Sequence, residues 1–442
     1  MTLRFGTDGV RGVAGTDLTP ELVLALGRAA ARVMGADRFL IGRDTRRSGT
    51  MLEAALAAGL ASEGSLVERL GVLPTPAVAF LSAKEGVPAA MISASHNPYA
   101  DNGVKLFAAG GRKLREATEV AIEAELDRLL TAPAGGGVDV GPVSERDDAG
   151  TRFVEHLRSS LEGRTLEGLS VVLDCAHGAA WRVGPLLLRD LGADVTVLGA
   201  DPDGVNINAG FGSTCPGPLQ EAVVAAGADA GLALDGDADR VIAVDHRGEV
   251  VDGDHLIAVC ALDLAARGRL RDRTVVVTVM TNLGFHLGMA EHGITVVQTP
   301  VGDRHVLEAM EAGTWSLGGE QSGHVIFADL ATTGDGLLTG LQVLDLVSRS
   351  GVPLATLAAT AMTRLPQVLR NVRVNGGAGD VVGAVADDVA AVEAELGGRG
   401  RVLIRPSGTE PVVRVMVEAP TAAQAEDAVS RLVAAVQQAG AP

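Results

Sequence analysis

The sequence is poor in aromatic residues and has no excess of positive charge, and both shortages exclude a class of partner. Phe, Trp and Tyr make up 2% of the 442 residues, and the formal net charge is −18. Such a chain has neither the rings on which nucleobases stack nor a basic surface for a phosphate backbone. We therefore expect no nucleic acid partner.

Long apolar runs are also missing. The segment from Met1 to Gly12 is polar, and the weakly charged run from Thr274 to Ala290 is interrupted by Asn282, Gly284, His286 and Gly288. Neither segment predicts a signal peptide or a membrane-spanning helix. The three cysteines, Cys175, Cys215 and Cys260, are an odd number at wide spacing, which fits neither a disulfide framework nor a zinc site. These absences predict a cytoplasmic protein with no membrane association.

Lysine is the scarcest charged residue. Among 37 basic residues the chain has only three lysines, which all lie near one stretch: Lys84, Lys105 and Lys113. A lysine ammonium can change its protonation state during a reaction, whereas an arginine guanidinium is effectively always charged. Lys105 is therefore a candidate for proton transfer.

The stretch near these lysines runs from Ala89 to Phe107. A short apolar strand, Ala89–Ile92, is followed by a polar loop that presents Ser93, Ser95, His96, Asn97, Asp101, Asn102 and Lys105. Pro98 keeps Asn97 out of the helical region, so Ser95 is held in an extended loop beyond a strand end. Two interpretations fit this loop alone: an Asx-type turn and a nucleophilic serine.

Strands alternate with helices along most of the chain. The pattern begins with a helix that opens at Thr19 and Pro20 and ends at Gly35, a strand over Arg38–Gly42 and a helix over Ser48–Ala61. Such alternation predicts a parallel or mixed sheet covered by helices. Three arginines between that strand and helix are interpreted as a solvated surface or a domain contact: Arg43, Arg46 and Arg47.

A break in the alternation predicts the domain organisation. Residues 131–143, TAPAGGGVDVGPV, are rich in Gly and Pro and predict a linker. The alternation then resumes, repeats again from about residue 248, and changes to a smaller α+β pattern from about residue 364. We expect three successive α/β domains with mixed sheets plus a smaller C-terminal α+β domain, with limits at residues 1–143, 144–247, 248–363 and 364–442.

Three carboxylates alternate in the loop LALDGDADRVIAVD between two apolar strands: Asp235, Asp237 and Asp239. Two like charges about 4 Å apart repel by about 4 kcal/mol at an effective dielectric near 20, so convergence favours a bound cation. Oxygen ligands favour Mg²⁺, Mn²⁺ or Ca²⁺ over zinc. A calcium EF-hand is excluded because Arg240 and His246 stand where that loop needs Gly and Glu. A metal-free acidic turn is the other interpretation.

Two further loops carry polar side chains suited to a sugar phosphate. GGEQSGHVIF places Glu320, Ser322 and His324 at alternate positions, where they could bind sugar hydroxyls or an amine, although a structural turn also fits. The loop RPSGTEP and the next strand supply parts of a phosphate site: Arg405, Ser407, Gly408, Thr409 and Arg414. Neither a Walker P-loop nor a G-x-S-x-G elbow occurs, which argues against an NTP-driven kinase and an α/β-hydrolase.

Taken together, these motifs resemble those of the α-D-phosphohexomutase superfamily. FGTDGVRG, ISASHNP with DNGVK, DGDADR, GEQSGH and RPSGTEP occur in the family's order along the whole chain. GEQSGH resembles the branch that acts on glucosamine phosphates more than the phosphoglucomutase or phosphomannomutase branches. The chain departs from the pattern at GSTCP, where relatives often have GSTHP, so that Cys215 stands at the histidine position. The resemblance implies four domains around a central cleft.

The resemblance also implies a role for each matching residue. Ser95 would be phosphorylated in the active enzyme, and together with Asp235, Asp237 and Asp239 it would hold one Mg²⁺. Proton transfer or charge stabilisation would fall to Lys105, Arg11 and His324. The sugar would be bound by Glu320 and Ser322. The distal phosphate would be bound by Arg405, Ser407, Gly408, Thr409 and Arg414.

The implied reaction is an isomerisation of glucosamine 6-phosphate and glucosamine 1-phosphate through a phosphoserine enzyme and a 1,6-bisphosphate. Its product would feed UDP-N-acetylglucosamine and cell-wall precursor synthesis. The alternative within the family is a mutase of hexose phosphates. A metal-dependent phosphatase and a non-catalytic sugar-phosphate sensor are the hypotheses from other classes. We expect a monomer or homodimer.

Overall fold

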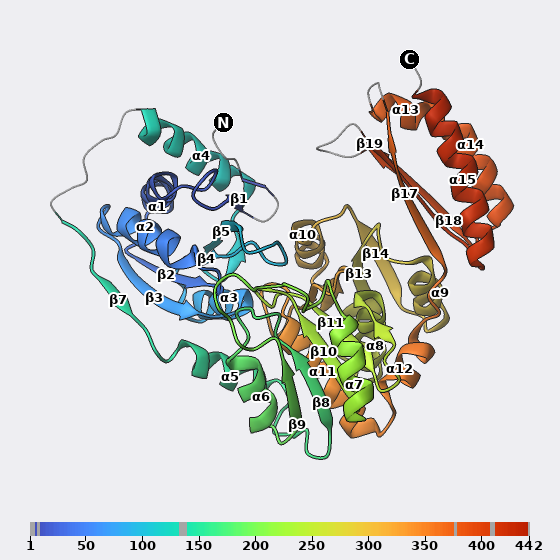
Figure 1. The fold of residues 1–442 in the computed structure, drawn as a ribbon, viewed down its shortest axis with the longest axis horizontal. Coiled ribbons are helices and arrows are strands. Elements are labelled where there is room, and N and C mark those ends of the chain that lie inside the picture. The colour runs from blue at the N-terminus through green and yellow to red at the C-terminus, as the bar shows by residue number, and fades with distance from the viewer. Residues whose placement is uncertain (1–4, 7–8, 132–138, 375–377, 407–411, 441–442) are drawn as a thin grey trace. The chain divides into compact units, whose positions relative to one another are not determined.

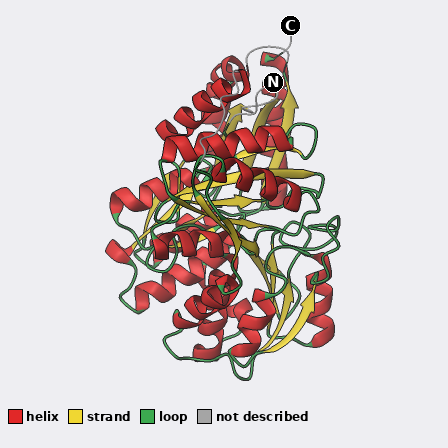
Figure 2. Cartoon of the chain, turned by 90° about the vertical axis from the view of Figure 1, so that its left-hand side faces the viewer, coloured by secondary structure: helices red, strands yellow, loops and turns green. Residues whose placement is uncertain are grey.

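The computed structural model describes residues 5–6, 9–131, 139–374, 378–406 and 412–440. Its elements form two compact units (Figure 1), and Figure 2 colours their helices red and their strands yellow. Unit 1 comprises Met1–Met280 and Ile294–Ala359, and unit 2 comprises Thr281–Gly293 and Thr360–Pro442. Within the described ranges, no helix is both long and apolar enough to cross a bilayer.

The first sheet of unit 1 is mixed. Its strands are β1 (Val10–Val13), β2 (Arg38–Arg43), β3 (Leu66–Val72), β4 (Ala89–Ile92), β5 (Asp101–Ala108), β6 (Arg112–Lys113) and β7 (Val143–Glu145). Their order is β1-β5-β4-β2-β3-β7, with β6 paired to β5. Strands β4, β2, β3 and β7 are parallel, whereas β5 is antiparallel to β4 and β1. The accompanying helices are α1 (Pro20–Met34), α2 (Gly49–Ala61), α3 (Thr75–Glu85) and α4 (Glu116–Thr131).

Two more mixed sheets complete unit 1. The second contains β8 (Ser170–Asp174), β9 (Asp194–Leu198), β10 (Ala230–Leu234), β11 (Val241–Asp245) and β12 (Val250–Val251), in the order β12-β11-β10-β8-β9. The third contains β13 (Thr274–Thr278), β14 (Thr295–Thr299), β15 (Leu317–Gly319) and β16 (Val325–Phe327), in the order β14-β13-β15-β16. Their helices are α5 (Ala149–Ser159), α6 (Val183–Asp190), α7 (Gly217–Ala226), α8 (Gly253–Ala266), α10 (Asp303–Gly313), α11 (Gly336–Ser350) and α12 (Leu354–Ala361).

Unit 2 is a small antiparallel sheet with helices. The strands β17 (Gln367–Arg373), β18 (Arg401–Pro406) and β19 (Val412–Glu418) pair in the order β17-β19-β18. Helices α13 (Ala378–Ala384), α14 (Ala386–Leu396) and α15 (Ala422–Ala439) pack on this sheet around a core that includes Val413, Val415 and Leu432. The expected fold class, three mixed-sheet α/β domains followed by a smaller α+β domain, is therefore confirmed.

Helix α9 (Leu283–Glu291) belongs to unit 2, although it lies in the sequence between β13 and β14 of unit 1. The buried Glu418 carboxylate accepts hydrogen bonds from the Leu283 N–H at 2.8 Å and from Arg401 at 3.0 Å. Asn282 donates to the Leu365 carbonyl at 3.1 Å and accepts from its N–H at 2.9 Å. These bonds satisfy the buried polar groups that join the helix to β18 and β19.

Several sequence expectations match the observed elements closely. Thr19 caps α1 by accepting a hydrogen bond from the Leu22 N–H at 3.3 Å, and the helix ends at Gly35, whose φ of 59° is left-handed. The strand expected over Arg38–Gly42 and the helix expected over Ser48–Ala61 are present as β2 (Arg38–Arg43) and α2 (Gly49–Ala61). The linker expected at 131–143 falls largely on residues outside the described ranges, and its last residue begins β7.

Two expectations were wrong. Lys105 lies on strand β5, not in the polar loop, because Asp101–Ala108 pairs with β4 and β1. The solvated surface is wrong for Arg46, which is 1% exposed, whereas the alternative of a domain contact fits Arg47, whose N–H donates to the Gly204 carbonyl at 2.8 Å.

A charged cluster centred on Glu85 joins helix α3 to the segment that leads into α5. The Glu85 carboxylate lies 2.7 Å from Arg38, 2.8 Å from Arg146 and 2.5 Å from Arg152, and its side chain is 14% exposed. Burial alone raises the pKa of a carboxyl group, but the hydrogen bonds from Arg146 and Arg152 outweigh it and lower the pKa of Glu85 to about 2.

Glu85→Gln is expected to lower the free energy of unfolding by about 2–3 kcal/mol at neutral pH. The native pKa is depressed, so this stabilisation is fully present above about pH 4.5 and is lost as the pH falls toward about 2. Thermal unfolding of the variant and the wild type at pH 7 and pH 3 measures it. The matched control is Glu145→Gln, because Glu145 also pairs with an arginine but is 59% exposed. Equal losses in the two variants, or a loss independent of pH, would contradict this prediction.

Candidate active site

Three loops of unit 1 meet at one buried acidic cluster. Ser95 follows β4, the three aspartates follow β10, and His324 precedes β16. Ligand oxygens of Asp235, Asp237 and Asp239 lie within 4.8 Å of one another, and all three residues are buried. The convergence expected from their alternate spacing is therefore present in the structure.

Ser95 lies directly on this cluster. Its hydroxyl donates a hydrogen bond to the Asp235 carboxylate at 2.5 Å, and the residue is 1% exposed. Its φ of 51° is left-handed, a conformation that costs a residue with a side chain on the order of 1 kcal/mol or more. Burial, together with the charges of Asp239 and Asp237, raises the pKa of Asp235 well above its usual range.

The donor set fits a divalent cation. Asp237 Oδ1 and Asp239 Oδ1 are both buried and have no hydrogen-bond partner among the described residues. A buried carboxylate oxygen without a partner is costly, and a cation bound by oxygen ligands would satisfy both atoms. The structure therefore supports a metal site at the three aspartates.

Lys105 reaches the cluster from strand β5. Its Nζ donates to Asp237 Oδ2 at 2.7 Å and lies 3.2 Å from Asp239 Oδ2, and the residue is 4% exposed. Burial raises the pKa of a carboxyl group, but Lys105 and His324 outweigh it and lower the pKa of Asp239 well below its usual range. A lysine, not an arginine, thus lies at the charged centre of the site.

Thr75 also donates hydrogen bonds to this cluster, although the sequence did not predict it as a site residue. The Thr75 hydroxyl donates to Asp237 Oδ2 at 2.6 Å, and its N–H donates to the Asp237 carbonyl at 2.9 Å. Asp237 Oδ2 is therefore occupied by Thr75 and Lys105, while Oδ1 remains available for a cation. The one signal in the sequence was Thr75-Pro76 at the start of α3.

Thr75→Val is expected to weaken Mg²⁺ binding by about 10- to 100-fold, because partners that orient a metal ligand typically contribute that much. Calorimetric titration of Mg²⁺ into chelator-treated protein measures the affinity without requiring turnover. Thr75→Ser is the matched control, since it keeps the hydroxyl and should bind with nearly wild-type affinity. Equal affinities of the valine and serine variants would show that the hydroxyl does not orient Asp237.

His324 lies between two carboxylates. Its Nδ1 is 3.8 Å from Asp239 and its Nε2 is 3.7 Å from Asp303, while Nε2 accepts a hydrogen bond from the Gly334 N–H at 3.1 Å. Burial lowers the pKa of an imidazole, but Asp239 and Asp303 outweigh it and raise the pKa of His324. The ring is thus positioned where a proton can be held beside the acidic cluster.

The opposite side of Ser95 is basic. Nδ1 of His96 lies 3.3 Å from the Ser95 hydroxyl and 3.4 Å from a terminal nitrogen of Arg240. Burial, Arg240 and Arg11 lower the pKa of His96, which favours a neutral ring. Arg11 lies on β1, opposite Gly103 of β5. Positive charge therefore gathers where an anion on Ser95 would lie, and no role was assigned to His96 or Arg240 from the sequence.

The loop of Glu320 carries polar atoms that lack partners. Ser322 Oγ and Gln321 Nε2 are buried and have no hydrogen-bond partner among the described residues. Glu320 accepts a hydrogen bond from the Gly302 N–H at 3.0 Å. The Ser322 hydroxyl and the Gln321 side-chain amide could therefore form hydrogen bonds with a polar ligand such as a sugar.

The residues expected to bind the distal phosphate lie in unit 2. Arg405 of β18 and Arg414 of β19 are directly opposite each other in the sheet. Burial and the nearby charge of Arg414 lower the pKa of Arg405, and like charges at opposed positions are destabilising without an anion between them. Ser407, Gly408 and Thr409 lie outside the described residues.

The sequence predicts that the three cysteines form neither a disulfide framework nor a zinc site. All three are free, and Cys175 and Cys260 are buried, which raises the pKa of both thiols. Cys215 is partly exposed and lies in the loop that follows β9.

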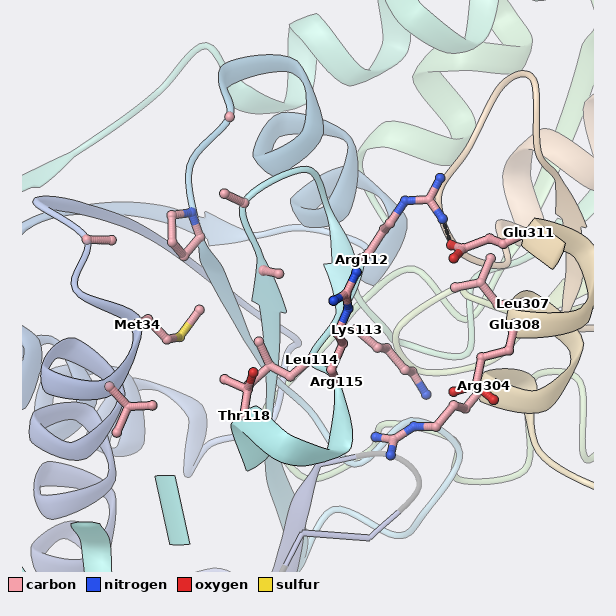
Figure 3. Close-up of a pocket in the computed structure, with 16 residues that line it drawn as sticks. Met34, Arg112, Lys113, Leu114, Arg115, Thr118, Arg304, Leu307, Glu308 and Glu311 are labelled. Carbon is pink, nitrogen blue, oxygen red and sulfur yellow. Dashed lines mark ion pairs between the residues drawn. The ribbon is translucent and has the colours of Figure 1, made fainter. Parts of the chain in front are cut away.

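A cavity of about 850 Å³ lies beside β6 and α10, and the three aspartates are not among the residues that line it (Figure 3). Its charged walls are paired: Arg112 with Glu311, Lys113 with Asp303 at 2.6 Å, and Arg304 with Glu119 at 2.6 Å. The 16 described residues that line it include none of the site residues expected from the sequence. The acidic cluster, and not this cavity, is the candidate active site.

Four family models match successive parts of the chain. They describe domains I, II and III and the C-terminal domain of phosphoglucomutase/phosphomannomutase, and they match residues 2–132, 151–248, 252–365 and 369–435. The Burkholderia thailandensis phosphoglucomutase/phosphomannomutase family protein superposes with a TM-score of 0.82 at 25% identity and covers 98% of this chain and 97% of its own. Aspergillus fumigatus N-acetylphosphoglucosamine mutase, solved with GlcNAc-6P and magnesium, shares the fold with a TM-score of 0.70 at 20% identity, over 100% of this chain and 96% of its own.

Curated relatives match nearly the whole sequence. The phosphoglucosamine mutase of Frankia alni is 55% identical over 99% of this chain and 99% of its own length. Those of Symbiobacterium thermophilum and Thermobifida fusca are each 55% identical, and they cover 95% and 98% of this chain and 95% and 97% of their own lengths. The chain therefore belongs to the phosphoglucomutase/phosphomannomutase family, on its phosphoglucosamine mutase branch.

Proposed function

We propose that the chain interconverts glucosamine 6-phosphate and glucosamine 1-phosphate through a phosphoserine at Ser95. The observation that carries this proposal is the Ser95 hydroxyl bonded to Asp235 at 2.5 Å, within a cluster of three convergent aspartates that Lys105 also contacts. Glucosamine is proposed as the sugar because the relatives that match the whole chain are phosphoglucosamine mutases. Conversion of hexose phosphates is the second candidate, since the family models name glucose and mannose mutases.

The positions of the residues around Ser95 indicate which of them transfer a proton and which stabilise charge. The phosphoryl group would leave Ser95 Oγ for the 1-hydroxyl of the bound sugar phosphate, and the hydroxyl proton would pass to a nearby base. Lys105 and His324 lie beside the cluster and are the groups positioned to take up or return that proton. Arg11, His96 and Arg240 lie near Ser95 and can stabilise charge on the transferred group. The bisphosphate would then return its 6-phosphoryl group to Ser95.

The remaining ligands follow from the same geometry. A Mg²⁺ held by Asp235, Asp237, Asp239 and the phosphorylated Ser95 would neutralise charge on the phosphoryl group. Glu320 and Ser322 would bind the sugar, while Arg405, Ser407, Gly408, Thr409 and Arg414 would bind its distal phosphate. The opposed arginines of β18 and β19 support an anion there.

Three further properties belong to this proposal. The domain limits at residues 1–143, 144–247, 248–363 and 364–442 are supported by the four matched family ranges. We propose a cytoplasmic enzyme, consistent with a phosphorylated sugar substrate and free cysteines. We propose a monomer or homodimer, which light scattering of the purified protein measures.

A coupled assay of the purified protein with glucosamine 6-phosphate, glucose 6-phosphate and mannose 6-phosphate tests the proposal. The expected result is the highest kcat/KM with glucosamine 6-phosphate, with activity that depends on Mg²⁺. A higher kcat/KM with either hexose phosphate would support the second candidate. Release of inorganic phosphate without isomerisation would indicate a phosphatase, and binding without turnover would indicate a sensor.

A further inference from the structure

Arg46 is a buried arginine beneath the serine loop. It is 1% exposed, and its side chain has the largest volume among the fully buried side chains of the described residues. It lies in the GRDTRRSG segment after β2 and pairs with Asp44, which is also fully buried. A guanidinium has five N–H donors and no acceptor, so its burial is tolerated only when those donors find partners.

Each of the five donors of Arg46 has an acceptor. Nε donates to Asp44 Oδ2 at 2.9 Å. The other four are directed to backbone carbonyls of the serine loop: Ser95 at 2.9 Å, Asn97 at 2.8 Å, Asp101 at 3.0 Å, and Pro98. Four backbone carbonyls of the loop that carries the reactive hydroxyl are therefore bonded to one side chain from a different segment.

The same group also fixes the N–H of Ser95. Asp44 accepts a hydrogen bond from the Ser93 hydroxyl at 2.7 Å, and that hydroxyl accepts one from the Ser95 N–H at 2.9 Å. Both backbone polar groups of Ser95 thus depend on the Asp44–Arg46 pair. A left-handed φ of 51° persists at a residue with a side chain only when its surroundings determine it in this way.

Asn208 also donates hydrogen bonds to two of the carbonyls that Arg46 binds. Its side-chain amide donates to the Ser95 carbonyl at 2.9 Å and to the Asn97 carbonyl at 3.1 Å. None of these contacts involves the Ser95 hydroxyl. They are therefore independent of whether the hydroxyl carries a phosphoryl group.

We infer that Arg46 is a positioning residue that keeps Ser95 in its reactive conformation while the serine is unphosphorylated, and so retains the bisphosphate until it reacts. This inference rests on the proposed function. In the second half of the cycle, the Ser95 Oγ–P bond forms, the bond from phosphorus to the sugar 6-oxygen breaks, and the Oγ proton ends on that oxygen. The bisphosphate either reacts in this way or leaves the site. A serine held in line favours reaction, because small misplacements of a reacting group can slow transfer by about 10²-fold.

Arg46→Lys is the informative variant. It keeps a positive charge for the buried Asp44, whose pairing would be lost in an alanine variant. An ammonium has three donors and no fork, so it cannot reach four carbonyls and a carboxylate. Arg47→Lys is the matched control, because Arg47 is the neighbouring residue and its side chain is exposed.

The experiment follows the phosphoryl group directly. Protein labelled with ³²P at the serine is mixed with glucosamine 6-phosphate and Mg²⁺, and the label found in free 1,6-bisphosphate is counted per turnover. For Arg46→Lys we expect about a tenfold rise in released bisphosphate, a fall of about tenfold or more in kcat, and a KM within about threefold of wild type. Added 1,6-bisphosphate should rephosphorylate the serine and restore the share of activity that is lost through release of the intermediate. Arg47→Lys should match the wild type in each measurement.

Two results would overturn the inference. One is a released fraction in Arg46→Lys equal to that of the wild type, and the other is an activity of this variant that added bisphosphate does not raise. If Arg46→Lys does not fold, Asn208→Gly tests the same hold, because glycine suits the left-handed φ of 60° at that position and removes the amide. It should raise released bisphosphate in the same direction, and an unchanged fraction would count against the inference. A wild-type protein without serine label or turnover would instead overturn the proposed function together with this inference.

Discussion

Ser95→Ala is expected to have no measurable mutase activity, a loss on the order of 10⁴-fold or more, while folding as the wild type does. The hydroxyl is the only group removed, and its contacts with Asp235 and with His96 are the ones that disappear. Alanine keeps the same Cβ, so the left-handed backbone at this position gains no new strain. Activity is measured with saturating glucosamine 6-phosphate and Mg²⁺, and folding by circular dichroism.

Intact-mass analysis shows whether Ser95 or another buried serine carries the phosphoryl group. Wild-type protein should contain a fraction about 80 Da heavier, the mass that one phosphoryl group adds, and Ser95→Ala should lack it. Ser65→Ala is the matched control, since Ser65 is also buried but its hydroxyl donates to the Ala36 carbonyl at 2.8 Å, outside both the serine loop and the acidic cluster. That variant should keep the heavier species. Activity of Ser95→Ala within a few-fold of wild type would remove Ser95 from the mechanism.

Lys105→Arg is expected to lose roughly 10²- to 10⁴-fold in kcat at saturating substrate and Mg²⁺. Arginine preserves the charge but cannot exchange a proton under ordinary conditions. Its longer planar group must also fit where Nζ lies 2.7 Å from Asp237 and 3.2 Å from Asp239, at a residue 4% exposed. Activity and Mg²⁺ affinity of the purified variant are the two measurements.

The metal measurement distinguishes two roles for Lys105. If the lysine only balances the charge of Asp237 and Asp239, the arginine variant should bind Mg²⁺ with altered affinity yet recover near-normal turnover once Mg²⁺ is saturating. Persistent loss at saturating Mg²⁺ supports proton exchange. Lys84→Arg is the matched control, because it is the same substitution at an exposed position of α3, and it should leave turnover unchanged.

Elements with local signals could be predicted from the sequence, and those without them could not. Thr19, Pro20 and Gly35 are cap residues, so the bounds of α1 could be predicted closely. The long helix α11 was missed, although Asp335 caps it by accepting from the Leu338 N–H at 2.9 Å and Gly351 ends it. Its length of 15 residues and its two cap residues are local signals of a helix, so α11 could also have been predicted.

The acidic cluster could be predicted because carboxylates at alternate positions after a strand identify a cation site by chemistry. Arg46 could not be identified in this way, because four of its five partners are backbone carbonyls, which every residue type provides. Thr75 was missed for a related reason, since its partner Asp237 comes from a distant loop. In both cases the burial that reveals the role exists only in the folded chain.

The placement of α9 has a consequence for the order in which the molecule can be completed during synthesis. Ribosomes release Leu283–Glu291 before Ile294–Ala359 of unit 1, and all of these before β18 and β19, which supply Arg401 and Glu418. Gly284 is also a close contact of the later segment, because a Cβ there would lie 1.9 Å from the Thr363 carbonyl oxygen.

A nascent chain therefore cannot finish unit 1 and then begin unit 2. Its apolar helix α9 is synthesised early and lacks its final partners while the rest of unit 1 is made. A ribosome that stalls near residue 363 would leave this helix without its partners in unit 2, although unit 1 is nearly complete. We expect such truncated chains to require a chaperone, whereas the finished chain buries the helix once β19 has formed.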